Sequence, residues 1–255
     1  MEKVIIILFG LMLGSFLNVV IYRLPRNLSL LLPPSSCPNC GKRIKIYENI
    51  PLISYLMLRG KCSKCKTKIP LSYPLVEVLT PFCFLLLYFQ YSFSLHFFAS
   101  CLFVCGLIAL GFIDYKHQIL PDEITLPGIA LAIVYSLFRN DLKLRDALTG
   151  AVVGAGILLL IYTLYYILRK KEGLGMGDVT MMLMVGAFLG WKQTLLTLIL
   201  ASFGGSLIGI ALILFAKKGA QHALPFGTFL APAAFASLLY GQQIINAYTS
   251  LSGLP

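Results

Sequence analysis

Two aspartates stand at the ends of long apolar runs in this chain, Asp114 after one run and Asp178 before another. A carboxylate at the edge of a hydrocarbon layer is costly to keep there, so it is a functional-site hypothesis by default. Two carboxylates held close together share a proton, so that one acts as a base on water while the other donates to the attacked carbonyl. The pair therefore favours aspartyl proteolysis, which needs neither a metal nor a covalent intermediate.

Each aspartate also has a purely structural interpretation. Asp114 fits a helix-end carboxylate in water, and Asp178 fits an N-cap for a helix that begins at Val179. The glycines before Asp178, Gly175 and Gly177, favour the functional interpretation. A backbone without side chains allows an extended peptide to approach closely and to form strand-like hydrogen bonds.

Other kinds of protein are alternatives to an aspartyl protease. An ion-coupled transporter or a membrane scaffold would also keep aspartates in the membrane, as sites that bind protons. The two halves of the chain do not show the matching broken hydrophobic segments of an inverted repeat. A zinc protease is disfavoured because the HExxH motif is absent. On the residues alone, proton coupling stays open beside proteolysis.

Four cysteines form a second candidate site. Cys37 and Cys40 make one CxxC pair and Cys62 and Cys65 another, with 21 residues between the pairs. This separation is close to that of four-cysteine zinc sites, in which each tight turn supplies two thiolates to a tetrahedral ion. The alternative is a pair of redox dithiols. All four ligands would be protein sulfurs, so we expect a structural zinc with no open catalytic position.

The composition defines the class of protein that positions these residues. The 255 residues are 58% hydrophobic and only 12% charged, and apolar stretches recur along the whole length. About eight stretches approach the length of a transmembrane helix, and the alternating pattern of a membrane barrel is absent. They are Val4–Tyr22, Leu71–Gln90, Leu95–Ile113, Ile124–Phe138, Ala147–Leu168, Val179–Gly190, Thr194–Ala216 and Phe226–Tyr248. Glycines spaced as GxxxG predict close helix packing at Gly150/Gly154, Gly186/Gly190 and Gly205/Gly209.

The net charge of +11 is explained by topology. Ten of the 21 Lys and Arg lie between Arg23 and Lys68. With the N-terminus outside, 16 of the 21 fall on cytoplasmic segments, as the positive-inside rule requires. Contact with anionic membrane lipid comes second as an explanation, and nucleic acid is not expected. Both aspartates then lie at the cytoplasmic face, and the first apolar segment is expected to be retained, because it lacks a basic leader and a cleavage site.

These observations predict an all-α integral membrane protein with about eight transmembrane helices and a small zinc-ribbon-like insertion. We expect three parts: a first helix over 1–22, a cytoplasmic four-cysteine module over 23–70, and a multi-helix membrane core over 71–255.

Several motifs occur in an order that resembles a known family. They are Gly14–Pro25, the two CxxC pairs, Tyr73–Glu77, Asp114 with Leu120–Asp122, Gly175–Asp178 and Leu224–Phe229. Together they resemble the type IV prepilin leader peptidases, also called prepilin peptidase/N-methyltransferases, which are GxGD-type membrane aspartyl proteases. The C-terminal motif departs from the family pattern at one position, where Thr228 replaces a proline. We expect that departure to affect only the start of a helix.

The resemblance implies a specific activity. Such enzymes remove the basic leader of prepilins or pseudopilins at the cytoplasmic face of the bacterial inner membrane, after glycine and usually before phenylalanine. Many then methylate the new N-terminus with S-adenosylmethionine. By motif position, Asp114 and Asp178 correspond to the catalytic aspartates, and the four cysteines to zinc ligands. Glu77 is a candidate for contacts with the substrate or in methyl transfer, and a helix-terminal carboxylate is an equal interpretation.

Overall fold

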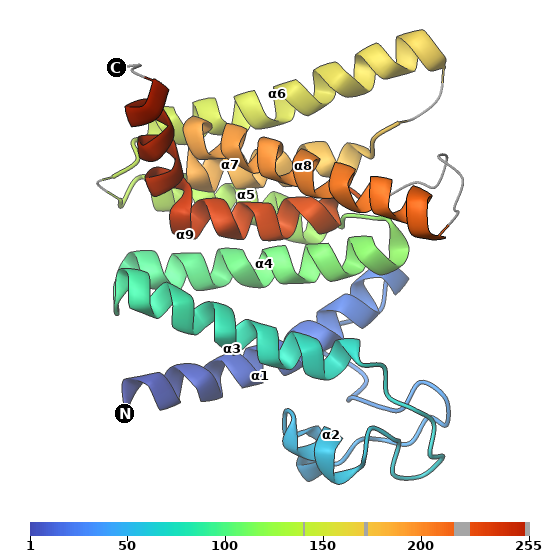
Figure 1. Cartoon of the computed structure of the whole chain (residues 1–255). Helices are drawn as coiled ribbons and strands as arrows, with labels where there is room; N and C mark the ends of the chain where they lie inside the picture. The colour runs from blue at the N-terminus through green and yellow to red at the C-terminus, as the bar shows by residue number, and fades with distance from the viewer. Residues whose placement is uncertain (140, 171–172, 217–224, 253–255) are drawn as a thin grey trace. The chain divides into compact units, whose positions relative to one another are not determined.

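The computed structural model describes residues 1–139, 141–170, 173–216 and 225–252 (Figure 1). Within these ranges every long element is an α-helix, and β-pairing is limited to two isolated bridges. The chain divides into two compact units, residues 1–109 and residues 110–255. The predicted all-α class is confirmed.

Two long helices of the first unit pack along each other. They are α1 (Glu2–Arg23) and α3 (Ser72–Tyr91), and α4 (Leu95–His117) begins in the same unit. A Cβ added to Gly10 would lie 2.5 Å from Pro81 Cα, and one added to Gly14 would lie 2.9 Å from Glu77 Cα. The two backbones therefore approach as closely as small residues allow in membrane helices. Asn18 Nδ2 adds a hydrogen bond of 3.0 Å to the Tyr73 carbonyl across this contact.

The cysteine segment between α1 and α3 holds only short elements. Three short helices, η1 (Leu24–Arg26), η2 (Ile46–Asn49) and α2 (Ile53–Met57), accompany two antiparallel bridges, Ser36–Arg43 and Lys61–Lys68. At its start, the buried Arg23 guanidinium donates to the carbonyls of Ser29 and Pro33 at 2.8 and 2.6 Å. A segment with so little regular structure has a small apolar core, so it depends on local contacts and cross-links.

The second unit is built around one short apolar helix. It contains the end of α4 and then α5 (Asp122–Ser136), α6 (Leu144–Arg169), α7 (Met176–Leu189), α8 (Trp191–Ala216) and α9 (Gly227–Ser252). Helix α7 touches α5, α6, α8 and α9, and it is buried on almost every side. An α-helix that is hydrophobic all round belongs in an interior, which explains its central place.

The glycine spacings predicted to mediate packing lie at the contact of α6 with α7. A Cβ on Gly150 would lie 2.3 Å from the Gly186 carbonyl oxygen, and one on Gly186 would lie 2.2 Å from the Gly150 oxygen. Gly154 is similarly close to Met182 and Thr194. The third pair, Gly205/Gly209, does not show such a close backbone contact at Gly205. A Cβ added there would lie 3.5 Å from the ring of Phe229, an ordinary van der Waals distance.

All eight predicted apolar segments are helices, but five of those described are long and apolar enough to cross a membrane: α1, α3, α4, α6 and α8. Helices α5 and α7 have 15 and 14 residues. At 1.5 Å per residue they reach only about 21–23 Å, against a hydrocarbon core of about 30 Å. Helix α9 is long, but Gln242, Gln243 and Asn246 make its second half polar.

Candidate functional site

Asp114 lies in the last turn of α4 and is held by the start of α9. Its side chain is buried, with 5% of its surface exposed. Its Oδ2 atom accepts a 2.8 Å hydrogen bond from the backbone N–H of Thr228 and lies 3.2 Å from the Thr228 hydroxyl. The water-exposed helix-end carboxylate of the structural interpretation is therefore not what the structure shows.

Asp178 lies in the first turn of α7, three residues beyond the N-cap. The helix begins at Met176 and its N-cap is Gly175, so the interpretation of Asp178 as the cap of a helix from Val179 is wrong. Asp178 Oδ2 still accepts the Gly175 N–H at 3.2 Å, as a third-position carboxylate often does. Its Oδ1 is buried without a hydrogen-bond partner among the described residues.

The two carboxylates are brought together within the second unit. They interact electrostatically, and the backbone N–H of Gly227 faces both of them. Gly227 is the first residue of α9, and a Cβ there would lie 3.0 Å from Asp114 Oδ2. The N-terminus of a helix carries partial positive charge and unpaired N–H groups, so it favours an anion at this place. The arrangement suits one ionised and one protonated carboxyl group sharing a site.

The glycines predicted to admit a peptide have distinct surroundings. Gly175 adopts ordinary extended angles (φ −77°, ψ 141°), and a Cβ there would lie 3.3 Å from Asp178 Oδ2. Gly177 lies inside α7, and its missing side chain makes room for Leu120, whose Cβ is 2.7 Å from the position of an added Cβ. The space at Gly177 is thus taken by the protein's own side chain. Gly175 is exposed, and its N–H and carbonyl are hydrogen-bonded to Asp178.

Glu77 in the first unit has a structural contact of its own. The carboxylate is buried in α3, and its Oε2 accepts the Leu52 N–H at 2.9 Å. Leu52 has φ 60° and ψ −47°, a sparsely populated positive-φ conformation that costs a non-glycine residue about 1–3 kcal/mol. Glu77 thereby holds a strained turn of the cysteine segment against α3. Glu77 lies beyond the first turn of α3, so it is not the helix-terminal carboxylate of the structural interpretation. Its role in contacts with the substrate or in methyl transfer stays a prediction.

The four cysteines occupy two turns of the same construction. In the first, the Cys37 N–H donates to the Lys42 carbonyl at 2.9 Å; in the second, the Cys62 N–H donates to the Thr67 carbonyl, also at 2.9 Å. The residue after each second cysteine, Gly41 or Lys66, has a positive φ of 67° or 59°. These matching turns present two sulfurs each, as the CxxC spacing predicts.

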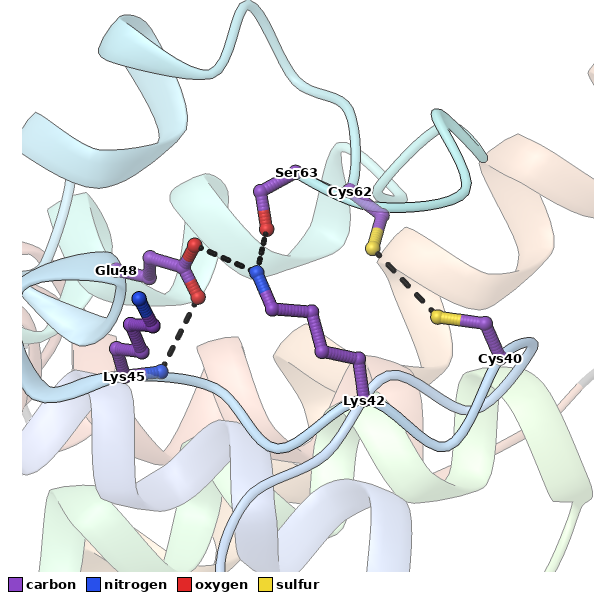
Figure 2. Close-up of polar contacts among 6 residues, drawn as sticks. All are labelled: Cys40, Lys42, Lys45, Glu48, Cys62 and Ser63. Atoms are coloured by element: carbon purple, nitrogen blue, oxygen red, sulfur yellow. Dashed lines mark hydrogen bonds and ion pairs between the residues drawn. The ribbon is translucent and has the colours of Figure 1, made fainter.

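The sulfur positions fit a tetrahedral metal ion. The four Sγ atoms lie within 4.8 Å of one another, with 3.8 Å between Cys37 and Cys65 and 4.0 Å between Cys40 and Cys62. Figure 2 shows the pair Cys40 and Cys62. Zinc–sulfur bonds of about 2.3 Å in a tetrahedron place the sulfurs about 3.8 Å apart. All seven cysteines are free thiols, so the structure contains no disulfide of the kind that the redox alternative would form.

The surroundings of these sulfurs bear on the thiolate form that zinc requires. The hydroxyl and backbone N–H of Thr67 lower the pKa of Cys65 to about 5. At Cys40 the Lys42 backbone favours the thiolate, but burial and the other three sulfurs raise its pKa to about 11. A cluster of four thiols cannot ionise fully by itself, whereas a bound divalent cation deprotonates its ligands.

Lys42 links the two halves of the cysteine segment. Figure 2 shows its Nζ between Glu48 Oε1, at 3.0 Å, and Ser63 Oγ, at 2.6 Å. Glu48 also accepts the Lys45 N–H at 3.1 Å. The Lys45 N–H, followed by Ser63 and Lys42, lowers the pKa of Glu48 to about 2. Lys42 follows the first CxxC and Ser63 lies within the second, so this bridge holds the cysteine turns in register.

Three residues that contribute to the two candidate sites could not be identified from the sequence. Thr228 lies at a helix start, as expected, but its N–H and hydroxyl also lie on Asp114, which the sequence did not indicate. Gly227 beside it belongs to the same motif, whose first residue, Leu224, falls outside the described residues. Lys42 is one of the ten basic residues between Arg23 and Lys68, and it belongs to no motif. The departure from the family motif at Thr228 was the one available signal.

Several long apolar helices, with two buried carboxylates close to a helix N-terminus, fit the class of multi-pass membrane proteins. The chain belongs to the type IV leader peptidase family. The family model described as "Type IV leader peptidase family" matches residues 101–210. A second model, described as "Bacterial Peptidase A24 N-terminal domain", matches residues 8–91.

Curated relatives cover nearly the whole chain. Proteins named prepilin leader peptidase/N-methyltransferase from Pseudomonas putida and Pseudomonas aeruginosa are each 38% identical to it, over 96% and 97% of this chain and 92% and 93% of their own lengths. The relative of the same name from Neisseria gonorrhoeae is 38% identical over 84% of this chain and 82% of its own length. No solved structure matches the chain.

Proposed function

We propose that this chain is an aspartyl endopeptidase that removes the basic leader from type IV prepilins or pseudopilins. Cleavage falls after glycine and usually before phenylalanine. The observation that carries the proposal is the juxtaposition of buried Asp114 and Asp178 in a member of the type IV leader peptidase family. The names of the relatives support the choice of substrate.

The proposed chemistry uses the pair as base and acid. The ionised carboxylate takes a proton from water as the water oxygen bonds to the scissile carbonyl carbon, and the protonated one donates to the carbonyl oxygen. The C–N bond of the resulting diol then breaks. The first group gives its proton to the leaving nitrogen, and the second recovers one from a hydroxyl. The pair ends as it began, with one proton, and the products are a carboxyl group and a new amine.

The proposal includes an orientation. We place the N-terminus outside and the aspartates at the cytoplasmic face of the inner membrane, on the strength of the distribution of Lys and Arg. Eight apolar helices would cross or enter the membrane, with the short α5 and α7 enclosed by others. A prepilin presents an apolar helix with its processing site at that boundary. The basic segment would also contact anionic lipid headgroups.

We further propose that the new N-terminal amine is methylated with S-adenosylmethionine, as the N-methyltransferase part of the relatives' names supports. Glu77 is the side chain proposed to contribute to substrate or methyl-transfer contacts. The peptidase core would occupy residues 71–255, after a first helix over 1–22 and a zinc module over 23–70. Cys37, Cys40, Cys62 and Cys65 would hold a structural zinc ion, which the sulfur distances support.

The test measures cleavage of a prepilin in membranes that contain Asp114→Asn or Asp178→Asn. We expect each change to lower the rate at least about 10³-fold, because each removes one partner of a coupled acid–base pair. Asp146→Asn is the matched control, because Asp146 lies in the first turn of α6 as Asp178 lies in the first turn of α7. The Asp146→Asn variant should cleave the prepilin at the normal rate. Mass spectrometry of the product's N-terminus reports the cleavage position and methylation together.

Normal cleavage by either asparagine variant would contradict the carboxyl-pair chemistry. That result would favour the alternative, a transporter or scaffold in which the same aspartates bind protons, and proton-coupled uptake would then be measured.

A further inference from the structure

The short helix α2 carries an exposed apolar face in the middle of the cysteine segment. Ile53, Leu56 and Met57 expose 55%, 73% and 78% of their surfaces. Their spacing of i, i+3 and i+4 puts them on one side of the helix, and together they form the α2 face. Tyr55 belongs to the other side and lies over Gly60, where an added Cβ would be 2.9 Å from the Tyr55 hydroxyl.

Such a face needs a partner. Large apolar side chains gathered on a surface in water mark a contact with another protein or with a membrane. Between Asn27 and Leu71, all of which the structure describes, no helix is long enough to cross a membrane. The α2 face is therefore not the lipid-facing side of a spanning helix, and its exposure has to be explained in another way.

A hydrogen bond places α2 beside a membrane helix. Leu52, the N-cap of α2, donates its N–H to Glu77 Oε2 at 2.9 Å. Glu77 is the sixth residue of α3, so it lies about 7–8 Å along that helix from its first residue. Helix α3 has 20 residues and is therefore about 30 Å long, the thickness of the hydrocarbon core. The start of α2 is thus held at the level where headgroups meet acyl chains.

The charge around the α2 face favours lipid as its partner. Residues 23–70 contain ten Lys and Arg and one acidic residue, Glu48. Arg59, two residues after Met57, is exposed, and in η2 the Lys45 Nζ lies 5.5 Å from the centre of the exposed Tyr47 ring. Anionic lipids attract a basic surface of this kind. The basic leader of the proposed substrate would be repelled by it.

We propose that the α2 face inserts into the cytoplasmic leaflet and holds the cysteine segment against the membrane surface. An interfacial helix buries its apolar side about 5–10 Å into the boundary between headgroups and acyl chains, while its basic neighbours stay with anionic headgroups. The inference rests on the proposed orientation of the chain and deepens the proposed lipid contact of the basic segment. It does not depend on the chemistry of the carboxyl pair.

The test places a single tryptophan at chosen positions of the full-length protein. The chain's one tryptophan is removed by Trp191→Phe, and Leu56→Trp or Met57→Trp then puts the fluorophore on the α2 face. Lys64→Trp is the control on the exposed surface of the second cysteine turn, and Phe203→Trp is the control in the middle of α8, where the side chain is exposed. Each protein is reconstituted in vesicles of phosphatidylcholine and phosphatidylglycerol, with bromine on the upper or the lower part of the phosphatidylcholine acyl chains as the quencher.

The two α2 variants should emit at shorter wavelength than Lys64→Trp. Bromine on the upper part of the chains should quench them at least about twice as strongly as it quenches Lys64→Trp, because the α2 face lies at that depth. Bromine on the lower part should quench them less, whereas Phe203→Trp should show the opposite preference. Bound zinc and prepilin cleavage equal to those of the parent identify the folded variants. If Leu56→Trp is misfolded, Met57→Trp decides the question.

Quenching of both α2 variants no stronger than that of Lys64→Trp would overturn the inference. So would emission that moves to shorter wavelength only when prepilin is added, because the α2 face would then bind the substrate instead of lipid. Cleavage by the parent in the same vesicles separates this failure from that of the proposed function. An active enzyme with unquenched α2 variants would refute only the insertion, whereas quenched variants of a protein that leaves prepilin uncut would support the insertion and refute the peptidase.

Discussion

At the scale of single residues, the candidate site combines groups that serve chemistry with groups that serve packing. Asp178 accepts the Gly175 N–H at the start of α7 with one oxygen, and its other oxygen is buried with no hydrogen-bond partner among the described residues. Gly177, next to it, is a packing residue, because Leu120 occupies the space that its missing side chain leaves. Of the two glycines before Asp178, only Gly175 is exposed, and its N–H and carbonyl are bonded to Asp178.

This distinction predicts the effect of Gly177→Ala. The added Cβ would lie 2.7 Å from Leu120 Cβ, so the start of α7 or the segment before α5 has to move. Overpacking of this kind typically costs about 1–3 kcal/mol, and it should also slow prepilin cleavage because Asp178 is the next residue. Unfolding midpoints in detergent and cleavage rates measure both effects. Gly204→Ala, which meets nothing within 4 Å, is the control, and equal behaviour of the two variants would contradict the prediction.

The aspartates and cysteines were predictable from the sequence because their residue types and spacings are unusual in an apolar chain. The contact of Thr228 with Asp114 was not, because it joins residues 114 positions apart through a backbone N–H, a group that every residue except proline has. Backbone donors leave no signature in residue types, so only the fold reveals them.

At the scale of helices, the apolar periodicity of the chain predicted where helices lie better than how many cross the membrane. Each predicted apolar segment is a helix, yet α5 and α7, with 15 and 14 residues, are too short to span a hydrocarbon core of about 30 Å. The contact between α6 and α7 was indicated by glycine spacing, and the structure shows backbone against backbone there. That contact fixes the helix that carries Asp178.

Gly150→Ala should therefore disturb the second unit strongly. A methyl group 2.3 Å from the Gly186 carbonyl oxygen and 2.8 Å from Gly190 Cα cannot be accommodated by a side-chain rotation, so α6 and α7 must separate. We expect a loss of at least about 1–3 kcal/mol in stability and a matching fall in cleavage. Gly156→Ala on the same helix meets open space and should be neutral or slightly stabilising, since alanine favours helices. Unfolding in detergent compares the two, and a neutral Gly150→Ala would contradict the close contact.

At the scale of the whole molecule, the chain consists of two compact units, and the two candidate sites lie in different ones. The cysteine cluster belongs to residues 1–109 and the aspartate pair to residues 110–255. The cysteine segment has short helices and two isolated bridges, held by Lys42 and by the four sulfurs. The second unit is held by long packed helices, which need no metal.

Loss of zinc should therefore unfold one segment and spare the other unit. We expect Cys40→Ser to lower the bound zinc from about one ion per chain towards none, because a structural site needs its four ligands. Residues 37–65 should then become sensitive to protease, while helical content stays nearly unchanged, since α2 and η2 are short. Elemental analysis, limited proteolysis and circular dichroism measure these outcomes. Cys101→Ala removes a buried helical thiol outside the cluster and should retain zinc and protease resistance. A zinc-free Cys40→Ser protein as protease-resistant as its parent would show that the Lys42 bridge and local packing suffice without the metal.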